Sequence, residues 1–329
     1  MSPVVRTVLG DVDPGTLGAV DYHEHLFQVT RLLPGDELDD ERRSQAESVL
    51  LRDAGASAMV EATPWGLGRR PAAVARISAA TGLHVVHTTG AHREAHYAAG
   101  DPLLDASVAS LTDLFAGELS DGMRASEDPA STELALDPSG RPVRAGVLKA
   151  GIGYWSISEF ERRVVTAVGA ISARTAAPVM VHLEHGSAAH EVLDLLAGLG
   201  CAPDRVVLAH VDRNVDPQLH LELARRGAML GYDGAGRHHR WPDSALLESL
   251  AFLVAAGAGD RVVLGGDVAR RTRYVAYGGM PGLSYLFDRF VPRLRQAVGE
   301  EATRQILVDN AAAWLTWAPE NMTHGGRGG

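Results

Sequence analysis

The sequence predicts an α/β protein built as a (β/α)8 TIM barrel with a short N-terminal β-hairpin. Eight apolar, β-prone runs recur along the chain, and segments with a helical pattern separate them. The runs are apolar almost throughout, which is typical of parallel strands that are covered on both faces. With 329 residues, the chain has a length that suits one large α/β barrel or two small domains. The unbroken alternation favours the single barrel.

The apolar runs and the helical segments between them define the expected elements. Strands are expected over residues 18–22, 57–62, 84–89, 145–148, 178–182, 205–209, 228–232 and 261–265. Ser158 is typical of an N-cap and precedes a helix expected over 159–175, and Asp216-Pro217 places proline at the first position of another helix. Further helices are expected over 243–256, 282–298 and 301–317.

The whole chain, residues 1–329, is expected to form one domain. Residues 1–16 form a lead-in hairpin with a turn at Asp13-Pro14-Gly15. The barrel is expected over 17–318, and a disordered tail over 319–329.

The longest gap between expected strands covers residues 90–144. It is expected to hold a helix over 108–119, and the rest forms either an insertion over the barrel mouth or a second hairpin. The competing fold is a doubly wound open sheet. That fold is disfavoured because no Gly-x-Gly-x-x-Gly or Walker sequence follows the first strand.

Composition and charge argue against several classes of function. The net charge is −10 and no run is rich in Lys and Arg, so the chain is not expected to bind nucleic acid. No apolar stretch reaches the ~18 residues of a membrane span, and residues 1–7 lack the apolar core of a signal peptide. Cys201 is the only cysteine, so no intrachain disulfide can form. These features favour a cytoplasmic location.

Residue types that ligate metals gather where the expected strands end. The first strand runs into Asp21-Tyr22-His23-Glu24-His25, and side chains two residues apart point to the same side of a strand. In an α/β barrel the C-terminal ends of the strands meet at one mouth, where the chemistry is located. The candidate ligands at these ends are His23, His25, Lys149, His182, His210 and Asp267. Four imidazoles and one carboxylate exceed the needs of one tetrahedral ion and would suit two ions with an anionic bridge.

This order of residues and its placement at strand ends resemble the phosphotriesterase-like branch of the amidohydrolase superfamily. The resemblance covers nearly the whole chain and includes Arg6-Thr7-Val8-Leu9-Gly10, His210-Val211-Asp212-Arg213-Asn214 and Asp309-Asn310. It implies a (β/α)8 barrel with a pair of divalent metal ions, often zinc, manganese, iron or cobalt. It also implies a lysine that CO2 converts to N6-carboxylysine, and a homodimer.

Carried over by position, the resemblance assigns each ligand to one of the two ions. The more buried ion would be held by His23, His25 and Asp267. The more exposed ion would be held by His182 and His210, and carboxylated Lys149 with a hydroxide would bridge both ions. A carbamate is an anionic oxygen donor, whereas an ordinary ammonium would be repelled by two dications. An unmodified lysine with one metal ion is the alternative.

The implied reaction is hydrolysis by a metal-activated water. Two dications lower the pKa of a shared water and so supply hydroxide at neutral pH. The hydroxide would attack an electrophilic carbon or phosphorus whose oxygen the more exposed ion polarises. Asp267 would take the attacking proton and deliver it to the leaving oxygen. Asp267 and Lys149 are therefore the expected catalytic residues.

Arginines that follow the last two expected strands indicate a small anionic substrate. The two loops carry Arg270, Arg271 and Arg273 after the eighth strand and Arg237 and Arg240 after the seventh. Many barrels bind phosphate at this place, and this part of the chain resembles the phosphorylated-sugar lactonases of the family. The resemblance implies that Arg240, Arg271 and Tyr274 hold a phosphate. The alternative interpretation is a solvated helix start with ion pairs at the rim. The favoured function is hydrolysis of an anionic or phosphorylated sugar lactone.

Other residues are expected near the pocket because of their position. His92 follows the third strand and would contact a substrate hydroxyl, where the family often carries an aromatic side chain; Tyr97 is a nearby alternative. Glu61 ends the second strand and would either accept a hydrogen bond from the substrate or brace the metal ligands. Asp212 and Arg213 would orient the histidine before them or form the rim of the pocket.

Three other functions stay open. An amidase or esterase that acts on an anionic acyl compound would use the same centre. A phosphotriesterase, which hydrolyses neutral organophosphates, would need a more apolar mouth than these arginines provide. A metal-binding protein without catalysis would need a closed coordination shell, whereas this set of ligands leaves positions open for water.

Overall fold

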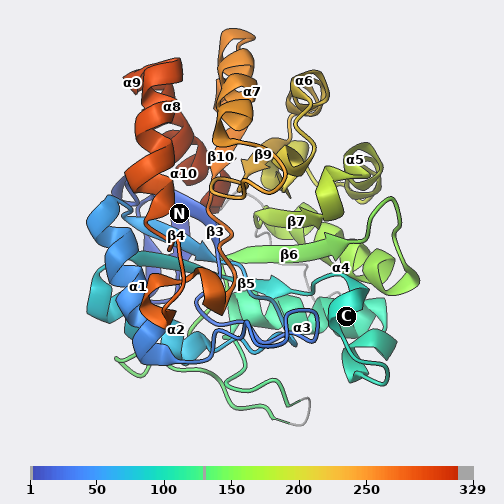
Figure 1. Cartoon of the computed structure of the whole chain (residues 1–329). Helices are drawn as coiled ribbons and strands as arrows, with labels where there is room; N and C mark the ends of the chain where they lie inside the picture. The colour runs from blue at the N-terminus through green and yellow to red at the C-terminus, as the bar shows by residue number, and fades with distance from the viewer. Residues whose placement is uncertain (1–2, 129–130, 318–329) are drawn as a thin grey trace.

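The computed structural model describes residues 3–128 and 131–317, and a barrel forms its centre (Figure 1). Eight parallel strands pair in sequence order: β3 (Val20–Glu24), β4 (Ala58–Glu61), β5 (His84–Gly90), β6 (Val147–Ile152), β7 (Val179–Leu183), β8 (Val206–Ala209), β9 (Met229–Tyr232) and β10 (Val262–Leu264). The ring closes where the backbone N–H of Asp267 donates to the carbonyl of His23 at 2.8 Å. Each expected strand overlaps one of these, and the predicted barrel fold is confirmed. The predicted tail over 319–329 lies outside the described residues.

Helices surround the strands. They are α1 (Glu41–Ala54), α2 (Pro71–Thr81), α3 (Val108–Ser120), α4 (Glu159–Thr175), α5 (Ala189–Gly198), α6 (Pro217–Arg225), α7 (Asp243–Ala255), α8 (Val291–Val298), α9 (Glu300–Arg304) and α10 (Asn310–Leu315). The bounds expected for α4 match, because Ser158 and Glu161 form a capping box that fixes its start. Within the described part of the chain, every helix is too short or too polar to cross a lipid bilayer.

Two expected helices at the C-terminal end have different bounds in the structure. The helix expected over 282–298 starts later, with a π-helical turn at Leu286–Phe290 that leads into α8. The helix expected over 301–317 ends at Leu315, because the next two residues form strand β11 (Thr316–Trp317). This strand pairs with β1 (Val4–Thr7), a partner that lies at the other end of the sequence.

The N-terminal hairpin lies against the N-terminal ends of the barrel strands. β1 pairs antiparallel with β2 (Gly10–Val12), which confirms the predicted hairpin, and β11 makes it a three-stranded sheet. The N–H of Val8 donates to the carbonyl of Val85, near the start of β5, at 2.8 Å. The hairpin is therefore on the side of the barrel opposite the strand ends that carry the candidate ligands.

The long segment before β6 forms α3 and then a second hairpin-like turn, one of the two predicted alternatives. Antiparallel bridges join Arg124 to Leu134 and Leu136 to Pro142. Arg141 donates to the carbonyl of Leu9 at 2.7 Å, so this turn packs on the N-terminal hairpin. This hairpin-like turn therefore lies away from the barrel mouth, whereas residues at the start of the segment, His92, Arg93 and His96, line the cavity there.

A β-bulge in β3 shapes the first ligand motif. Val20 and Asp21 pair with consecutive residues of β4, but the next pair joins Glu24 to Glu61, so β3 carries one extra residue. As a result Tyr22 packs in the cluster that fills the barrel interior, although its neighbour His23 also faces the strand ends. A second, larger cluster fills the space between the strands and the helices.

Candidate metal centre

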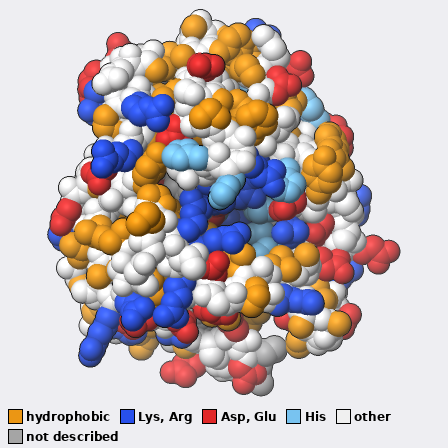
Figure 2. Space-filling model, in the orientation of Figure 1, with side chains coloured by type: hydrophobic (Ala, Val, Ile, Leu, Met, Phe, Trp, Pro, Cys, Tyr) orange, Lys and Arg blue, Asp and Glu red, His pale blue; other side chains and the backbone are white. Residues whose placement is uncertain are grey.

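A cavity of about 770 Å³ opens at the C-terminal ends of the barrel strands. Five of the predicted ligands line it: His23, His25, His182, His210 and Asp267. Figure 2 shows this hollow facing the viewer, with Arg and His side chains gathered around it. The sixth predicted ligand, Lys149, is fully buried, with its amine next to His23. The structure thus brings together all six side chains from five separate strand ends.

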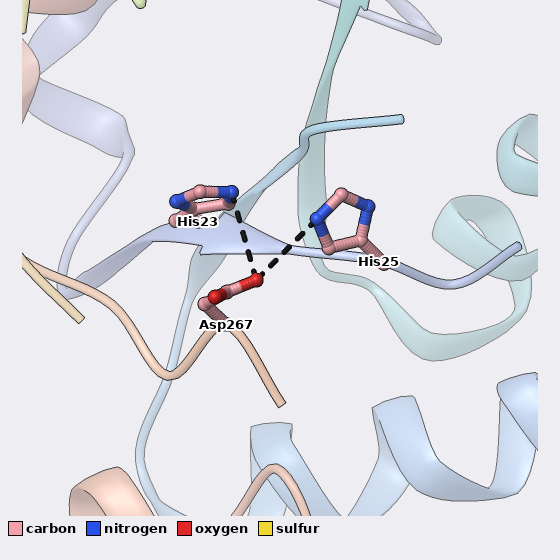
Figure 3. Close-up of side chains that lie close together, drawn as sticks. All are labelled: His23, His25 and Asp267. Carbon is pink, nitrogen blue, oxygen red and sulfur yellow. Dashed lines mark ion pairs between the residues drawn. The ribbon is translucent and has the colours of Figure 1, made fainter. Parts of the chain in front are cut away.

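His23, His25 and Asp267 form the first half of the centre (Figure 3). Oδ1 of Asp267 lies 3.8 Å from Nε2 of His23 and 3.5 Å from Nε2 of His25. One ligand atom from each residue lies within 4.8 Å of the others, which is close enough for a shared metal ion. The backbone of Asp267 has a φ of 41°, a value that residues other than glycine rarely adopt. This turn after β10 lets the carboxylate face β3.

Hydrogen bonds on the outer side of each ring determine which nitrogen faces the cavity. Nδ1 of His23 lies 3.1 Å from Oδ2 of Asp233, and a carboxylate only accepts, so Nδ1 carries the proton. Nδ1 of His25 lies 2.7 Å from Oγ1 of Thr63, whose own hydrogen is donated to the carbonyl of Phe27. Nδ1 of His25 therefore also donates. Both rings present an unprotonated Nε2 to the centre, as a metal ligand requires.

His182 and His210 form the second half. Nε2 of His182 lies 2.9 Å from Oε2 of Glu184, and Nδ1 of His210 lies 2.6 Å from Oδ1 of Asp233, so both outer nitrogens donate. The inner nitrogens, Nδ1 of His182 and Nε2 of His210, then both carry lone pairs, and they lie only 2.8 Å apart. Two lone pairs at that distance repel each other unless a cation lies beside them. The donor set therefore fits a metal ion at this position.

Burial keeps the candidate ligand histidines neutral. Loss of solvent lowers the pKa of His25 to about 4 and that of His210 to about 3. The same cause lowers the pKa of His23 and His182. Neutral imidazole is the form that binds metals, so these rings are ready to act as ligands at neutral pH.

Lys149 extends from β6 toward the first half of the centre. Its Nζ lies 3.2 Å from Nε2 of His23 and 3.2 Å from Sδ of Met180. Burial lowers the pKa of Lys149 to about 8, so part of the amine is uncharged near neutral pH. An uncharged amine is the nucleophilic form that can add to CO2. The position therefore suits the carboxylated lysine, which stays a prediction.

Two arginines hold the other oxygen of Asp267. Oδ2 accepts a hydrogen bond from Arg213 at 2.9 Å and another from Arg237. Burial by itself would raise the pKa of Asp267, but the guanidinium of Arg237 holds it well below its usual range. Asp267 is therefore an ionised carboxylate whose two oxygens have different partners. Of the two roles considered for Arg213, the rim of the pocket matches, since Arg213 lines the cavity.

The arginine loop after β10 presents different residues to the cavity from those predicted. Arg271 is exposed and is not part of the cavity lining. Arg270 and Arg273 line the cavity in its place, because Arg271–Arg273 forms a turn of 3-10 helix. Tyr274 is fully buried and donates its hydroxyl to the carbonyl of His25, so it supports the first strand end rather than facing the cavity.

The remaining predicted pocket residues divide into lining and supporting groups. His92 and Arg240 line the cavity. The hydroxyl of Tyr97 is buried behind the lining and accepts from the N–H of His92 at 2.9 Å. Glu61 is also buried, where it accepts from the N–H of Leu26, and burial raises its pKa to about 7. Of the two roles considered for Glu61, its contacts match the bracing of the ligand loop.

Three residues that orient the histidines were not among the predicted site residues. Asp233 directly follows β9, so applying the strand-end rule to the seventh barrel strand would have identified it. Glu184 comes two residues after His182, and acidic residues near ligand histidines are a recurrent signal. Thr63 carries no signal in the sequence, because its role depends on the neighbouring loop.

Comparisons with known proteins agree with the geometry. The model of the Phosphotriesterase family matches residues 3–315. A phospho-furanose lactonase from Mycoplasmopsis synoviae is 30% identical, covering 93% of this chain and 89% of the relative. An N-acetyltaurine hydrolase from Danio rerio is 28% identical, and the match covers 95% of this chain and 98% of the relative. The crystal structure of a lactonase from Listeria monocytogenes matches with a TM-score of 0.86 and 30% identity, covering 96% of this chain and 99% of that one. The chain therefore belongs to the phosphotriesterase family and is a metal-dependent hydrolase, as the resemblance implied.

Proposed function

We propose that this protein is a lactonase with two divalent cations and that it opens a small anionic lactone, in particular a phosphorylated sugar lactone. The observation that carries the proposal is the orientation of four histidines. Their outer nitrogens all donate to protein acceptors, so four lone pairs converge in one cavity. One cation would be held by His23, His25 and Asp267, and the other by His182 and His210. Carboxylated Lys149 would supply anionic oxygens to both.

The protein residues then orient the reactants and move the proton. When bound, the two cations lower the pKa of water and polarise the carbonyl of the lactone. Oδ1 of Asp267 faces the histidines, so it would accept the proton of the attacking water and pass it to the ring oxygen that leaves. Arg213 and Arg237 hold Oδ2 and keep the carboxylate in that orientation. One water is consumed and one hydroxy acid is produced.

The cavity is cationic although the whole chain carries a net charge of −10. Several of its arginines already have carboxylate partners: Arg93 with Glu184, Arg213 and Arg237 with Asp267, and Arg270 with Asp36. Arg240 and Arg273 also line the cavity, and no carboxylate of the described residues lies within 4.0 Å of either side chain. Nη1 of Arg273 donates to the carbonyl of Val268 at 3.4 Å, and both guanidinium groups keep further donors that can bind a phosphate or another anion. Similarity to phospho-furanose lactonases supports this assignment.

A second candidate is hydrolysis of an amide bond in a small anionic acyl compound. N-acetyltaurine hydrolases from several vertebrates are 26 to 29% identical to this chain. N-acetyltaurine is an anionic amide, so the same arginines would serve it. Neutral organophosphates are disfavoured as substrates, because they gain nothing from a cationic cavity. The homodimer implied by the resemblance stays a prediction.

A substrate panel separates these functions. The protein, loaded with Mn²⁺ or Zn²⁺ in bicarbonate, is assayed with matched sugar lactones with and without a phosphate, with N-acetyltaurine and with a neutral phosphotriester. The chelated protein is the control. We expect the largest kcat/KM for the phosphorylated lactone. A larger kcat/KM for the unphosphorylated lactone or for the triester would contradict the proposal, and a larger value for N-acetyltaurine would favour the second candidate.

A further inference from the structure

One buried carboxylate contacts a candidate ligand in each half of the centre. Oδ1 of Asp233 accepts from Nδ1 of His210 at 2.6 Å, and Oδ2 accepts from Nδ1 of His23 at 3.1 Å. Asp233 has no solvent exposure, so water cannot replace either contact. By contrast, Glu184 contacts only His182, and Thr63 contacts only His25 among these ligands. Asp233 is therefore shared between the two halves.

Tyr22 holds Asp233 from within the barrel. Its hydroxyl donates to Oδ2, the same oxygen that accepts from His23. The bulge in β3 allows Tyr22 to face the barrel interior next to His23, and its ring packs edge-on against Trp314 at a centroid distance of 6.3 Å. A Cβ atom at Gly231 would overlap with the Tyr22 hydroxyl. Glycine at this place on β9 therefore makes room for the phenol.

The backbone also fixes Asp233. The N–H of His210 approaches Oδ2 at 3.3 Å, and Asp212 accepts from the N–H groups of Asp233 and Gly234 at 3.0 and 2.7 Å. With its oxygens and its own backbone N–H all engaged, the carboxylate cannot rotate without losing a contact. A displacement of His23 is then transmitted to His210 through one rigid group.

We propose that Tyr22 and Asp233 form a positioning unit that couples the two cation subsites. The inference rests on the proposed function, because it needs two divalent cations. Asp233 fixes the tautomer and the ring orientation of His23 and His210 together. A cation bound by the first half therefore holds Asp233 in place and prepares His210 for the second cation. The phenol of Tyr22 sets the position of the shared carboxylate.

Stepwise titration of the metal-free protein with Co²⁺ tests this coupling. A competing chromophoric chelator gives the two affinities, and the visible Co²⁺ spectrum reports the ligand geometry. We expect Asp233→Asn to weaken both cations by roughly 10- to 100-fold. Tyr22→Phe keeps the ring and removes only the hydroxyl, and we expect it to weaken both by roughly tenfold, the lower end of that range.

Matched controls distinguish a shared contact from a local one. Glu184→Met and Thr63→Val each remove an acceptor from one histidine, so each is expected to weaken one cation only. Tyr232→Phe removes another buried hydroxyl, which contacts His220 and Ser249 and no candidate ligand, and is expected to bind both cations as the wild type does.

The outcomes separate the coupling from the proposed function. In one outcome, the wild type binds two cations while Tyr22→Phe and Asp233→Asn keep the wild-type affinities or lose affinity for one cation only. That result would overturn the coupling and leave the proposed function standing. Fewer than two cations in the wild type would overturn the proposed function and the coupling with it. If Asp233→Asn fails to fold, Tyr22→Phe decides the question, because phenylalanine fills nearly the same volume.

Discussion

Arg240 and Arg273, the cavity arginines that form no ion pair with a carboxylate of the described residues, allow a quantitative test of substrate charge. Replacing Arg273 with glutamine removes a partly buried guanidinium, and a hydrogen bond to a charged group contributes about 1.5–3 kcal/mol. The kcat/KM for an anionic lactone should therefore fall roughly 10- to 150-fold. Arg240 is exposed, so solvent and salt screen its charge and Arg240→Gln should cost up to about 1 kcal/mol, or about fivefold. The structure thus predicts the larger effect for Arg273, whereas the family resemblance assigned Arg240 and not Arg273 to the phosphate.

The assay compares one lactone ring with and without a phosphate, at low and at high salt. Both variants should lose activity toward the phosphorylated lactone and keep it toward the neutral one. Arg225→Gln, which changes an exposed arginine on α6 outside the cavity, is the matched control and should leave both values unchanged. An equal fall for the neutral lactone in Arg273→Gln would refute the reasoning, because the guanidinium would then act on the centre and not on the substrate charge.

Three further predictions follow from the site and its surroundings. Asp267→Asn should still bind cations but lower kcat by about 10²- to 10⁴-fold, and a wild-type kcat would exclude Asp267 as the proton carrier. Burial lowers the pKa of Lys149 to about 8, so the fraction of neutral amine increases as pH rises toward that value. At a fixed CO2 pressure, the rate at which added metal restores activity to the apo-protein should therefore increase up to about pH 8 and then level off. A rate that does not change with pH would contradict carboxylation of Lys149. Arg69→Met leaves Glu118 buried without its ion-pair partner and should lower the free energy of unfolding by about 3–5 kcal/mol in denaturant titration, and a loss below about 1 kcal/mol would refute this role.

The sequence was sufficient to predict the barrel and the convergence of the candidate metal ligands. Strand alternation and the rule that barrel strands end at one mouth place His23, His182 and Asp267 together, although they are far apart in the chain. The rule works because parallel strands all end on the same side. The same rule would have predicted Asp233 at the end of the seventh strand, but only the arginines in the loop after that strand were considered.

Local backbone geometry limited the rest of the prediction. Arg271 and Arg273 are equivalent in the sequence, and only the 3-10 turn decides which of them lines the cavity. The bulge that lets Tyr22 and His23 share one side of β3 leaves no signal in the alternating pattern. Thr316–Trp317 follow a helical pattern but pair with β1, because a tertiary contact overrides local propensity there.

Metal content and turnover measured on the same sample test the central claim most directly. Cations are removed by exhaustive chelation and returned stepwise in bicarbonate, while bound metal and lactone hydrolysis are followed together. We predict that turnover disappears on chelation and returns as the protein reaches two divalent cations per chain. Full turnover by the chelated protein, or recovery that is complete with no bound metal, would contradict the claim.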